Sequence, residues 1–142
     1  MKTERISLCL IFILCNVLVL NAQETIHISL GDREDATCEI RETLMKSRSD
    51  QVKIIFERGV YYCLSDYANE KYCVISNHGN GTKKILFSLA NYKTIEIIGN
   101  GATLLFHGRI MPFLFENCQS VKIKGLTINW DIPFTFLGEV VS

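Results

Sequence analysis

The chain has 142 residues, 48% of them hydrophobic, and its 15 basic and 15 acidic residues leave no formal net charge. This length and composition fit one globular domain with a sizeable core. The charge balance offers no electrostatic footprint for nucleic acid, so we expect no nucleic-acid partner.

The N-terminus has the order of a secretory signal. Lys2 and Arg5 precede an apolar run over residues 6–20, which ends in the small and polar residues 21–23. The apolar run is shorter than the about 20 residues that a membrane span needs. We therefore expect residues 1–22 to be a signal peptide and the mature chain to be exported, without stable membrane insertion after cleavage.

The mature chain opens with a short helix and continues in strands. Residues 32–35 are polar and acidic, which suits a helix start, and residues 36–47 carry apolar residues at helical spacing. Residues 52–56, 60–62 and 84–89 are rich in β-branched and aromatic residues and are predicted to be strands. The polar stretches 66–71 and 77–84, the second with Gly79 and Gly81, are predicted to be loops.

A repeat then organises the chain. Residues 91–99 recur 26 residues later as residues 117–125, with Asn at the start and Gly at the end of both copies. Behind each Gly the alternation continues, so that residues 102, 104 and 106 align with residues 128, 130 and 132. A fixed period of this size indicates a solenoid.

We therefore predict an all-β fold, a right-handed parallel β-helix with a short N-terminal capping helix. Residues 23–142 would form the N-terminal part of this domain, which we expect to continue beyond Ser142. In the repeat, Asn91 and Asn117 are expected to form a structural ladder that satisfies buried backbone groups. Gly99 and Gly125 are expected at corners that need a positive φ.

The cysteines and histidines point to no metal site. Four cysteines remain after the signal peptide, and they lack a Cys-x-x-Cys pair, while the three histidines lack metal-ligand spacing. We predict no metal and no cofactor. A bridge between Cys63 and Cys73 is one interpretation, and cysteines that act as small buried hydrophobic residues are the other.

Four residues are candidates for binding substrate: His107, Arg109, Trp130 and Asp131. His107 and Arg109 interrupt an apolar run at a turn, and the guanidinium fork of an arginine can bind sugar hydroxyls or carboxylates. Arg109 could equally pair with Glu116 or a carbonyl. Trp130 could stack on a sugar ring or fill the interior, and Asp131 follows it at the end of a strand.

The other charged residues have structural explanations. The acidic residues Asp32, Glu34 and Asp35 suit a helix N-terminus. Glu96 and Lys122 occupy equivalent outward positions of the two repeats, and we expect an exposed ion pair between them.

Three segments carry a resemblance to a known family. Residues 75–78 (Ile-Ser-Asn-His), residues 101–113 with His107-Gly108-Arg109, and residues 125–134 with Trp130-Asp131 resemble the N-terminal half of the α-1,3-galactosidases of glycoside hydrolase family 110. The family usually has an acidic residue before the Trp, where this chain has Asn129 and instead carries Asp131 after it.

This resemblance implies a bacterial exo-acting glycoside hydrolase that releases terminal α-1,3-linked galactose from glycans of the blood group B type, with inversion and without a cofactor. It also implies a periplasmic or extracellular location and catalytic carboxylates beyond Ser142, so that residues 1–142 alone would be inactive. The alternative is a non-catalytic glycan-binding or adhesin-type β-helix. A polysaccharide lyase would instead need basic catalytic residues and a calcium-binding acidic cluster.

Overall fold

The computed structural model describes residues 23–31, 35–76 and 79–132. The predicted signal peptide, residues 77–78 and the segment after residue 132 lie outside this part of the chain. The described part is mostly strand, which confirms the all-β class. Its elements are β1 (Glu24–Ile28), α2 (Ala36–Lys46), β2 (Gln51–Phe56), β3 (Val60–Leu64), a 3-10 turn η1 (Ser65–Tyr67), β4 (Asn69–Cys73), β5 (Gly81–Ala90), β6 (Thr94–His107), β7 (Met111–Glu116) and β8 (Ser120–Trp130).

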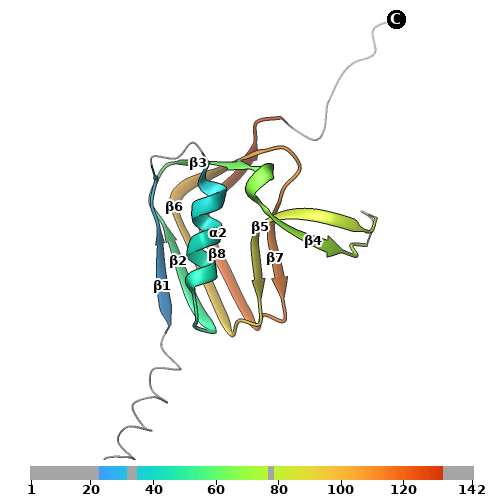
Figure 1. The fold of residues 1–142 in the computed structure, drawn as a ribbon. Helices are drawn as coiled ribbons and strands as arrows, with labels where there is room; N and C mark the ends of the chain where they lie inside the picture. The colour runs from blue at the N-terminus through green and yellow to red at the C-terminus, as the bar shows by residue number, and fades with distance from the viewer. Residues whose placement is uncertain (1–22, 32–34, 77–78, 133–142) are drawn as a thin grey trace, which may run out of the picture.

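The strands form two sheets (Figure 1). One is five-stranded and parallel: β1 pairs with β2, β2 with the first half of β6, β3 with the second half of β6, and β8 with both halves of β6. The other is three-stranded, with β5 between an antiparallel β4 and a parallel β7. Because β6 pairs with two successive strands, it must bend between its halves.

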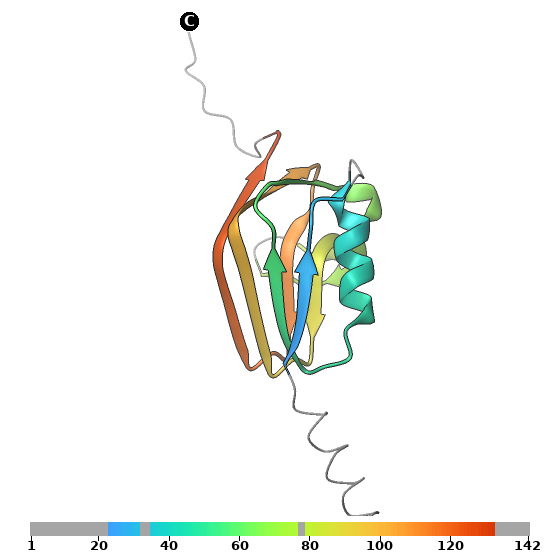
Figure 2. The same ribbon diagram turned by 90° about the vertical axis from the view of Figure 1, so that its left-hand side faces the viewer.

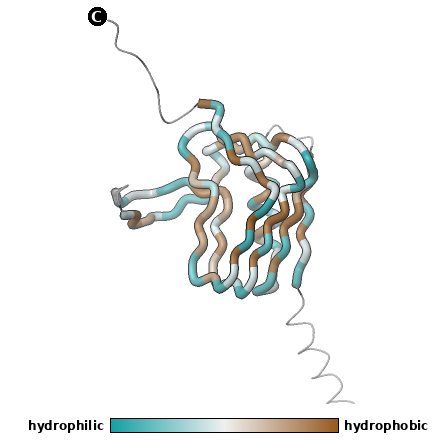
Figure 3. Tube along the Cα trace, turned by 180° about the vertical axis from the view of Figure 1, so that it is seen from behind, coloured by the Kyte–Doolittle hydropathy of each residue, from teal (hydrophilic) through white to brown (hydrophobic). Residues whose placement is uncertain are grey.

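Alternation along the strands places the core between the sheets. In β2 every second residue is buried, and the same pattern runs through both halves of β6. Figure 3 shows this alternation of hydrophilic and hydrophobic residues along the strands. Alternation with a period of two buries one face of a strand and leaves the other in water. Phe56, Phe87 and Phe106 are fully buried in this core.

The predicted helix is present as α2 and packs against β1, β3 and β5 (Figures 1 and 2). It therefore bridges the two sheets. Asp35 is its N-cap, and its Oδ1 accepts hydrogen bonds from the backbone N–H of Thr37 at 2.9 Å and of Leu64 at 3.1 Å. This one carboxylate starts the helix and ties it to the end of β3.

The two segments predicted to be loops are in part strands. Residues 66–71 include the start of β4, and residues 77–84 include the start of β5, and the two strands pair as an antiparallel hairpin. The hairpin stands out from the body (Figure 1), and exposed polar residues such as Glu70, Lys71 and Thr82 lie along its strands. Its strands therefore lack the apolar alternation of a buried sheet.

The predicted offset of 26 residues between β6 and β8 holds in the first half of β8 and changes in the second half. Thr94 to Ile98 pair with residues 26 positions later, such as Thr94 with Ser120. After an irregularity between Ile98 and Ala102, the offset falls to 24, so that Leu104 pairs with Ile128 and Phe106 with Trp130. The predicted alignment of residues 102, 104 and 106 with residues 128, 130 and 132 is therefore wrong by two residues.

The reason is that the two strands turn the corner with different numbers of residues. In β6 the corner takes Asn100 at φ 50° and Gly101 at φ 82°, whereas in β8 it takes Gly125 at φ 66°. Asn100 also donates its side-chain amide to the carbonyl of Phe56 at 3.0 Å. The corner of β6 is thus attached to the end of β2.

Gly99 and Gly125 have different structural roles. Gly125 has the positive φ expected at a corner, but Gly99 is not among the residues with positive φ. A Cβ on Gly99 would lie 2.3 Å from the carbonyl oxygen of Gly125. Gly99 is therefore required for close packing of two backbones, and the predicted reason for it is wrong.

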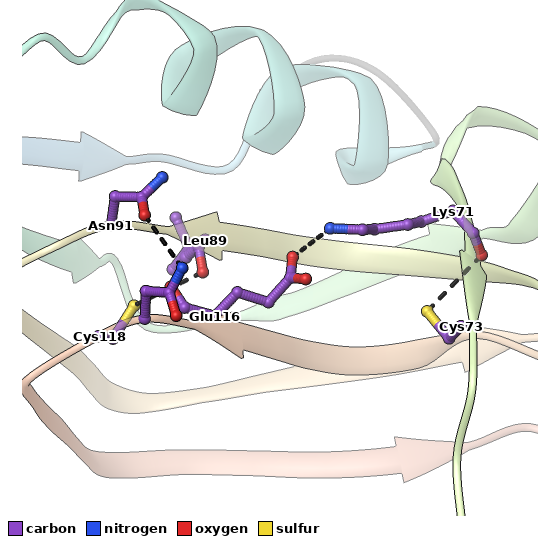
Figure 4. A network of polar contacts seen from close by, with 7 residues as sticks. Lys71, Cys73, Leu89, Asn91, Glu116 and Cys118 are labelled. Carbon is purple, nitrogen blue, oxygen red and sulfur yellow. Dashed lines mark hydrogen bonds and ion pairs between the residues drawn. The ribbon is translucent and has the colours of Figure 1, made fainter.

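Asn91 and Asn117 lie one above the other at the turns after β5 and β7. Both have positive φ, at 65° and 52°, which asparagine tolerates better than most residues. The Nδ2 of Asn117 donates to the Oδ1 of Asn91 at 3.3 Å, and both side chains are exposed. Figure 4 shows Asn91 beside Glu116, whose backbone carbonyl accepts from the N–H of Asn91 at 2.9 Å.

The predicted ion pair between Glu96 and Lys122 is wrong in its partner. Glu96 lies 3.0 Å from the Nζ of Lys124 and 3.8 Å from that of Lys53. The hydrogen bond from Lys124 is the main cause that lowers the pKa of Glu96. Lys122 lies directly opposite Glu96 in the strand pairing, but the ion pair is made by Lys124, two residues further along the same face of β8.

All four cysteines of the described residues are unbridged, so the predicted bridge between Cys63 and Cys73 is not formed. The Sγ of Cys63 lies 3.6 Å from the carbonyl oxygen of Tyr61, and that of Cys73 lies 3.6 Å from the carbonyl oxygen of Lys71. Burial, with a contribution from the charge of Asp35, raises the pKa of Cys63 to about 12. A protonated thiol of this kind is a poor nucleophile.

Replacing Asp35 tests its double role. Asp35→Ala removes the acceptor of two backbone N–H groups, and we expect it to lower the free energy of unfolding by about 1–2 kcal/mol. Asp35→Asn keeps an acceptor oxygen and should lose less than half of that. Urea denaturation followed by circular dichroism measures both, and equal losses in the two variants would contradict the capping role.

Replacing Gly99 tests the backbone contact. In Gly99→Ala the new methyl group meets the backbone of β8, which has little room to move, and we expect a loss of about 3 kcal/mol. The matched control is Gly79→Ala, where the Cβ meets nothing within 4 Å and only the positive φ of 67° is unfavourable, costing about 1 kcal/mol. Thermal or urea unfolding compares them, and a Gly99→Ala loss no larger than that of the control would refute the close-packing explanation.

Candidate functional site

The ends of β6 and β8 bring two of the predicted residues together. β6 ends at His107 and β8 at Trp130, and the N–H of Asp131 donates to the carbonyl of Phe106 at 3.1 Å, which extends the strand pairing by one residue. This places Asp131 beside His107, and the Nδ1 of His107 makes a hydrogen-bonded ion pair with the Oδ2 of Asp131.

This pairing was missed in the sequence, although both residues were named. With a constant repeat of 26 residues Asp131 would align with Leu105. The change of offset at the corner moves Asp131 by two positions, so that it lies next to His107 instead. The signal that could have revealed it is the Asn100-Gly101 pair, which has no counterpart beside Gly125.

The pKa of Asp131 is lowered in this pair. The hydrogen bond from His107 is the main cause that lowers the pKa of Asp131, and the N–H of Ile132, which donates to the Oδ1 at 2.7 Å, acts in the same direction. The carboxylate is therefore ionised at neutral pH and accepts from the Nδ1–H of the imidazole. The Nε2 of His107 is left for another partner, and the side chain is 61% exposed.

Trp130 lies on the inner side of the same strand end. Its ring packs against Phe106, with centroids 5.3 Å apart and ring planes at 32°, and it is half-buried against the core. Of the two roles considered for Trp130, packing into the interior is the one that this contact favours.

Arg109 lies in the turn after β6 and is exposed. Glu116, one of the partners considered for it, instead pairs with the Nζ of Lys71 (Figure 4). Arg109 is two residues beyond His107, so the same turn carries an imidazole and a guanidinium into solvent. These groups offer hydrogen-bond donors to a polar ligand, and Asp131 offers an acceptor.

The site has one carboxylate that is already engaged in an ion pair. Glycoside hydrolysis by the usual routes needs two carboxyl groups with a sugar between them. Among the described residues, this pair by itself does not supply two free carboxyl groups.

Metal binding and membrane crossing are considered for the residues that the structure describes. Among them, no group of three or more histidine, cysteine, aspartate or glutamate side chains is placed to hold a metal ion. In the same residues, no helix is both long enough and apolar enough to cross a membrane.

The known proteins that this chain is similar to include several alpha-1,3-galactosidases. No family model matches the chain. An alpha-1,3-galactosidase A of Shewanella woodyi is 32% identical over 122 residues, which are 80% of this chain and 20% of that protein. An alpha-1,3-galactosidase B of Bacteroides thetaiotaomicron is 32% identical over 90 residues, which are 63% of this chain and 15% of that protein.

A third relative, an alpha-1,3-galactosidase B of Akkermansia muciniphila, is 27% identical over 126 residues, 87% of this chain and 16% of that protein. The chain thus spans a fifth or less of the length of these three relatives. The predicted resemblance to the α-1,3-galactosidases is confirmed.

The lowered pKa of Asp131 gives a direct test of the site. In ¹³C NMR titration of the side-chain carboxyl, we expect a midpoint below the ordinary value of 3.8, and a return toward 3.8 in His107→Ala. Because the folded pKa is the lower one, the ionised carboxylate stabilises the fold above pH 3.8, and this contribution is lost as the pH falls through the folded pKa.

Arg109→Ala is the matched control, since it removes a charge from the same turn without removing the hydrogen bond. We expect the Asp131 titration in this variant to match that of the unaltered chain. An equal upward shift in both variants would mean that the general field of the turn, and not the His107 bond, lowers the pKa.

Proposed function

We propose that this chain, a sequence relative of the alpha-1,3-galactosidases, is the N-terminal segment of an exported bacterial glycoside hydrolase. The observation that carries the proposal is the 32% identity over 122 residues to the Shewanella woodyi protein, which extends over 80% of this chain. The proposed reaction is exo-acting release of terminal α-1,3-linked galactose from glycans of the blood group B type.

We propose further that the two sheets are the first coils of a right-handed parallel β-helix capped by α2. The parallel stacking of β1, β2, β6 and β8 supports this, because inward positions of one strand continue in the next. Ile97 and Leu104 of β6 are fully buried, whereas their partners Ile123 and Ile128 in β8 are each 39% exposed. A further coil stacked on β8 would cover these side chains.

In this proposal the reaction inverts the anomeric configuration and uses no cofactor. One carboxylic acid protonates the leaving oxygen, and a carboxylate about 6.5–9.5 Å away activates a water on the opposite face of the sugar. Coils of a β-helix repeat at about 4.8 Å, so carboxylates two coils apart approach this separation. We place both beyond Ser142, with His107, Arg109 and Asp131 as substrate-binding groups of the first coils.

Export is part of the proposal. Residues 1–22 would act as a signal peptide, cleaved after Ala22, and the mature protein would work in the periplasm or outside the cell without remaining in the membrane. The partner is then a carbohydrate with a terminal α-galactose, and no nucleic acid.

A second candidate is a glycan-binding or adhesin-type β-helix that does not hydrolyse its ligand. It is favoured by one observation, the engagement of Asp131 in an ion pair with His107, which leaves an exposed imidazole for hydrogen bonding but no ready acid–base pair in the described site. Activity of the natural full-length protein separates the two candidates.

The test incubates the natural full-length protein with galactosyl-α-1,3-galactose and follows the products by ¹H NMR. We expect release of galactose, first as the β-anomer, because inversion at an α-linkage gives that product. No release would favour the binding protein, and first release of the α-anomer would contradict inversion.

In the same assay His107→Ala should raise KM roughly tenfold and change kcat less than about twofold, as for loss of a hydrogen bond to bound substrate. Lys53→Ala, on the outer face of β2, is the control and should change neither constant. An unchanged KM in His107→Ala would remove the binding role.

A further inference from the structure

A second concave surface lies away from the His107 end of the sheets. A groove of about 330 Å³ separates α2 from the base of the β4–β5 hairpin; we call it the α2–β4 groove. Its lining residues are Arg41, Leu44, Met45, Asn69, Glu70, Lys71, Ser88, Leu89 and Tyr92. This volume is at the lower end of the range for pockets that bind small molecules.

The floor of the groove rests on the hydrophobic core. Leu89 is 2% exposed and belongs to the core, and Leu44 and Tyr92 are half-buried and pack against it. The groove therefore rests on the same core that joins the two sheets. A floor of this kind, with an aromatic ring, accepts the apolar face of a ligand.

Its walls carry polar groups that the fold holds in position. The Nη1 of Arg41 donates to the carbonyl of Tyr67 at 2.9 Å, and the Nδ2 of Asn69 donates to that of Leu86 at 3.4 Å. Lys71 pairs with Glu116 of β7 (Figure 4). Each contact joins a wall residue to a different element, so the walls need little ordering when a ligand binds.

The charges of the walls oppose one another. Arg41 and Lys71 are positive, while Glu70 in the groove and Glu116 beside it are negative. Lys84, outside the lining, lies 3.8 Å from Glu70. With both signs interleaved, the groove has no strong field of one sign that would select an anion or a cation. It offers donors, acceptors and a hydroxyl at its rim, above an apolar floor.

We propose that the α2–β4 groove binds a neutral oligosaccharide, as a site separate from that of His107 and Asp131. Sugars combine an apolar face with a ring of hydroxyls, and this is the combination that the floor and walls match. The choice of a carbohydrate as the ligand rests on the proposed function. In an enzyme that acts on chain ends, such a site would hold a part of the glycan remote from the reacting bond.

The experiment titrates the whole 142-residue chain with galactosyl-α-1,3-galactose and records ¹H–¹⁵N spectra. We expect the backbone signals of Arg41, Ser88 and Tyr92 to shift with one dissociation constant, in low salt and in 0.5 M NaCl alike, as for a neutral ligand. Absence of saturable shifts in these residues, or shifts abolished by salt, would overturn the proposal.

Two tryptophan variants test whether the ligand binds in the α2–β4 groove. Ser88 is exposed on β5, so Ser88→Trp should fill the groove without disturbing the core, and we expect it to weaken binding at least tenfold. Ser120→Trp places the same ring on an exposed position of β8 and should not change the affinity. Equal weakening by Ser88→Trp and Ser120→Trp would refute the groove as the site.

The binding experiment on the groove and the galactose-release assay can fail independently of each other. Galactose release by the full-length protein with no shifts in the groove would overturn this inference alone. Saturable shifts in the groove with no galactose release would overturn the hydrolase and leave the groove as the site of a glycan-binding protein.

Discussion

The corner in β6 between Ile98 and Ala102 is the constraint on which the rest of the structure depends. The first half of β6 pairs with β2 and the second with β3, so one continuous strand must follow two directions. The positive φ values of Asn100 and Gly101 allow the turn, and the bond from Asn100 to Phe56 holds it against the end of β2. Because β8 lies on β6 along both halves, it inherits the same bend.

From this corner follow both the core and the site at the strand ends. Each half of β6 presents alternate residues to the interior, where Ile97 and Phe106 are fully buried, and the outward residues carry the ion pairs of Glu96. The two residues by which β6 and β8 differ at the corner decide which side chains meet further along. They bring His107 and Asp131 into contact, and the proposed substrate-binding role depends on that contact.

Much of the fold could be predicted because it follows from local pattern. The acidic start and helical spacing located α2, and the β-branched alternation located β2, β3 and β6, since both signals come from residues that lie close together in the chain. Residues 84–89 of β5 were predicted in the same way, but β4 and the first residues of β5 were not. The polar residues of this hairpin satisfy their backbone groups by pairing across it, and polarity alone does not distinguish such strands from loops.

The sequence by itself determined the strand class, the helix with its acidic start, the repeat in the first half of β8, and the relationship to the α-1,3-galactosidases. These depend on residue type and on short or constant spacing. Only the tertiary structure decided that Glu96 pairs with Lys124, that Gly99 is required by the backbone of β8, and that His107 meets Asp131. The physical reason is that each of these contacts depends on the register between strands after a corner, where an inserted residue moves every later side chain against its neighbour.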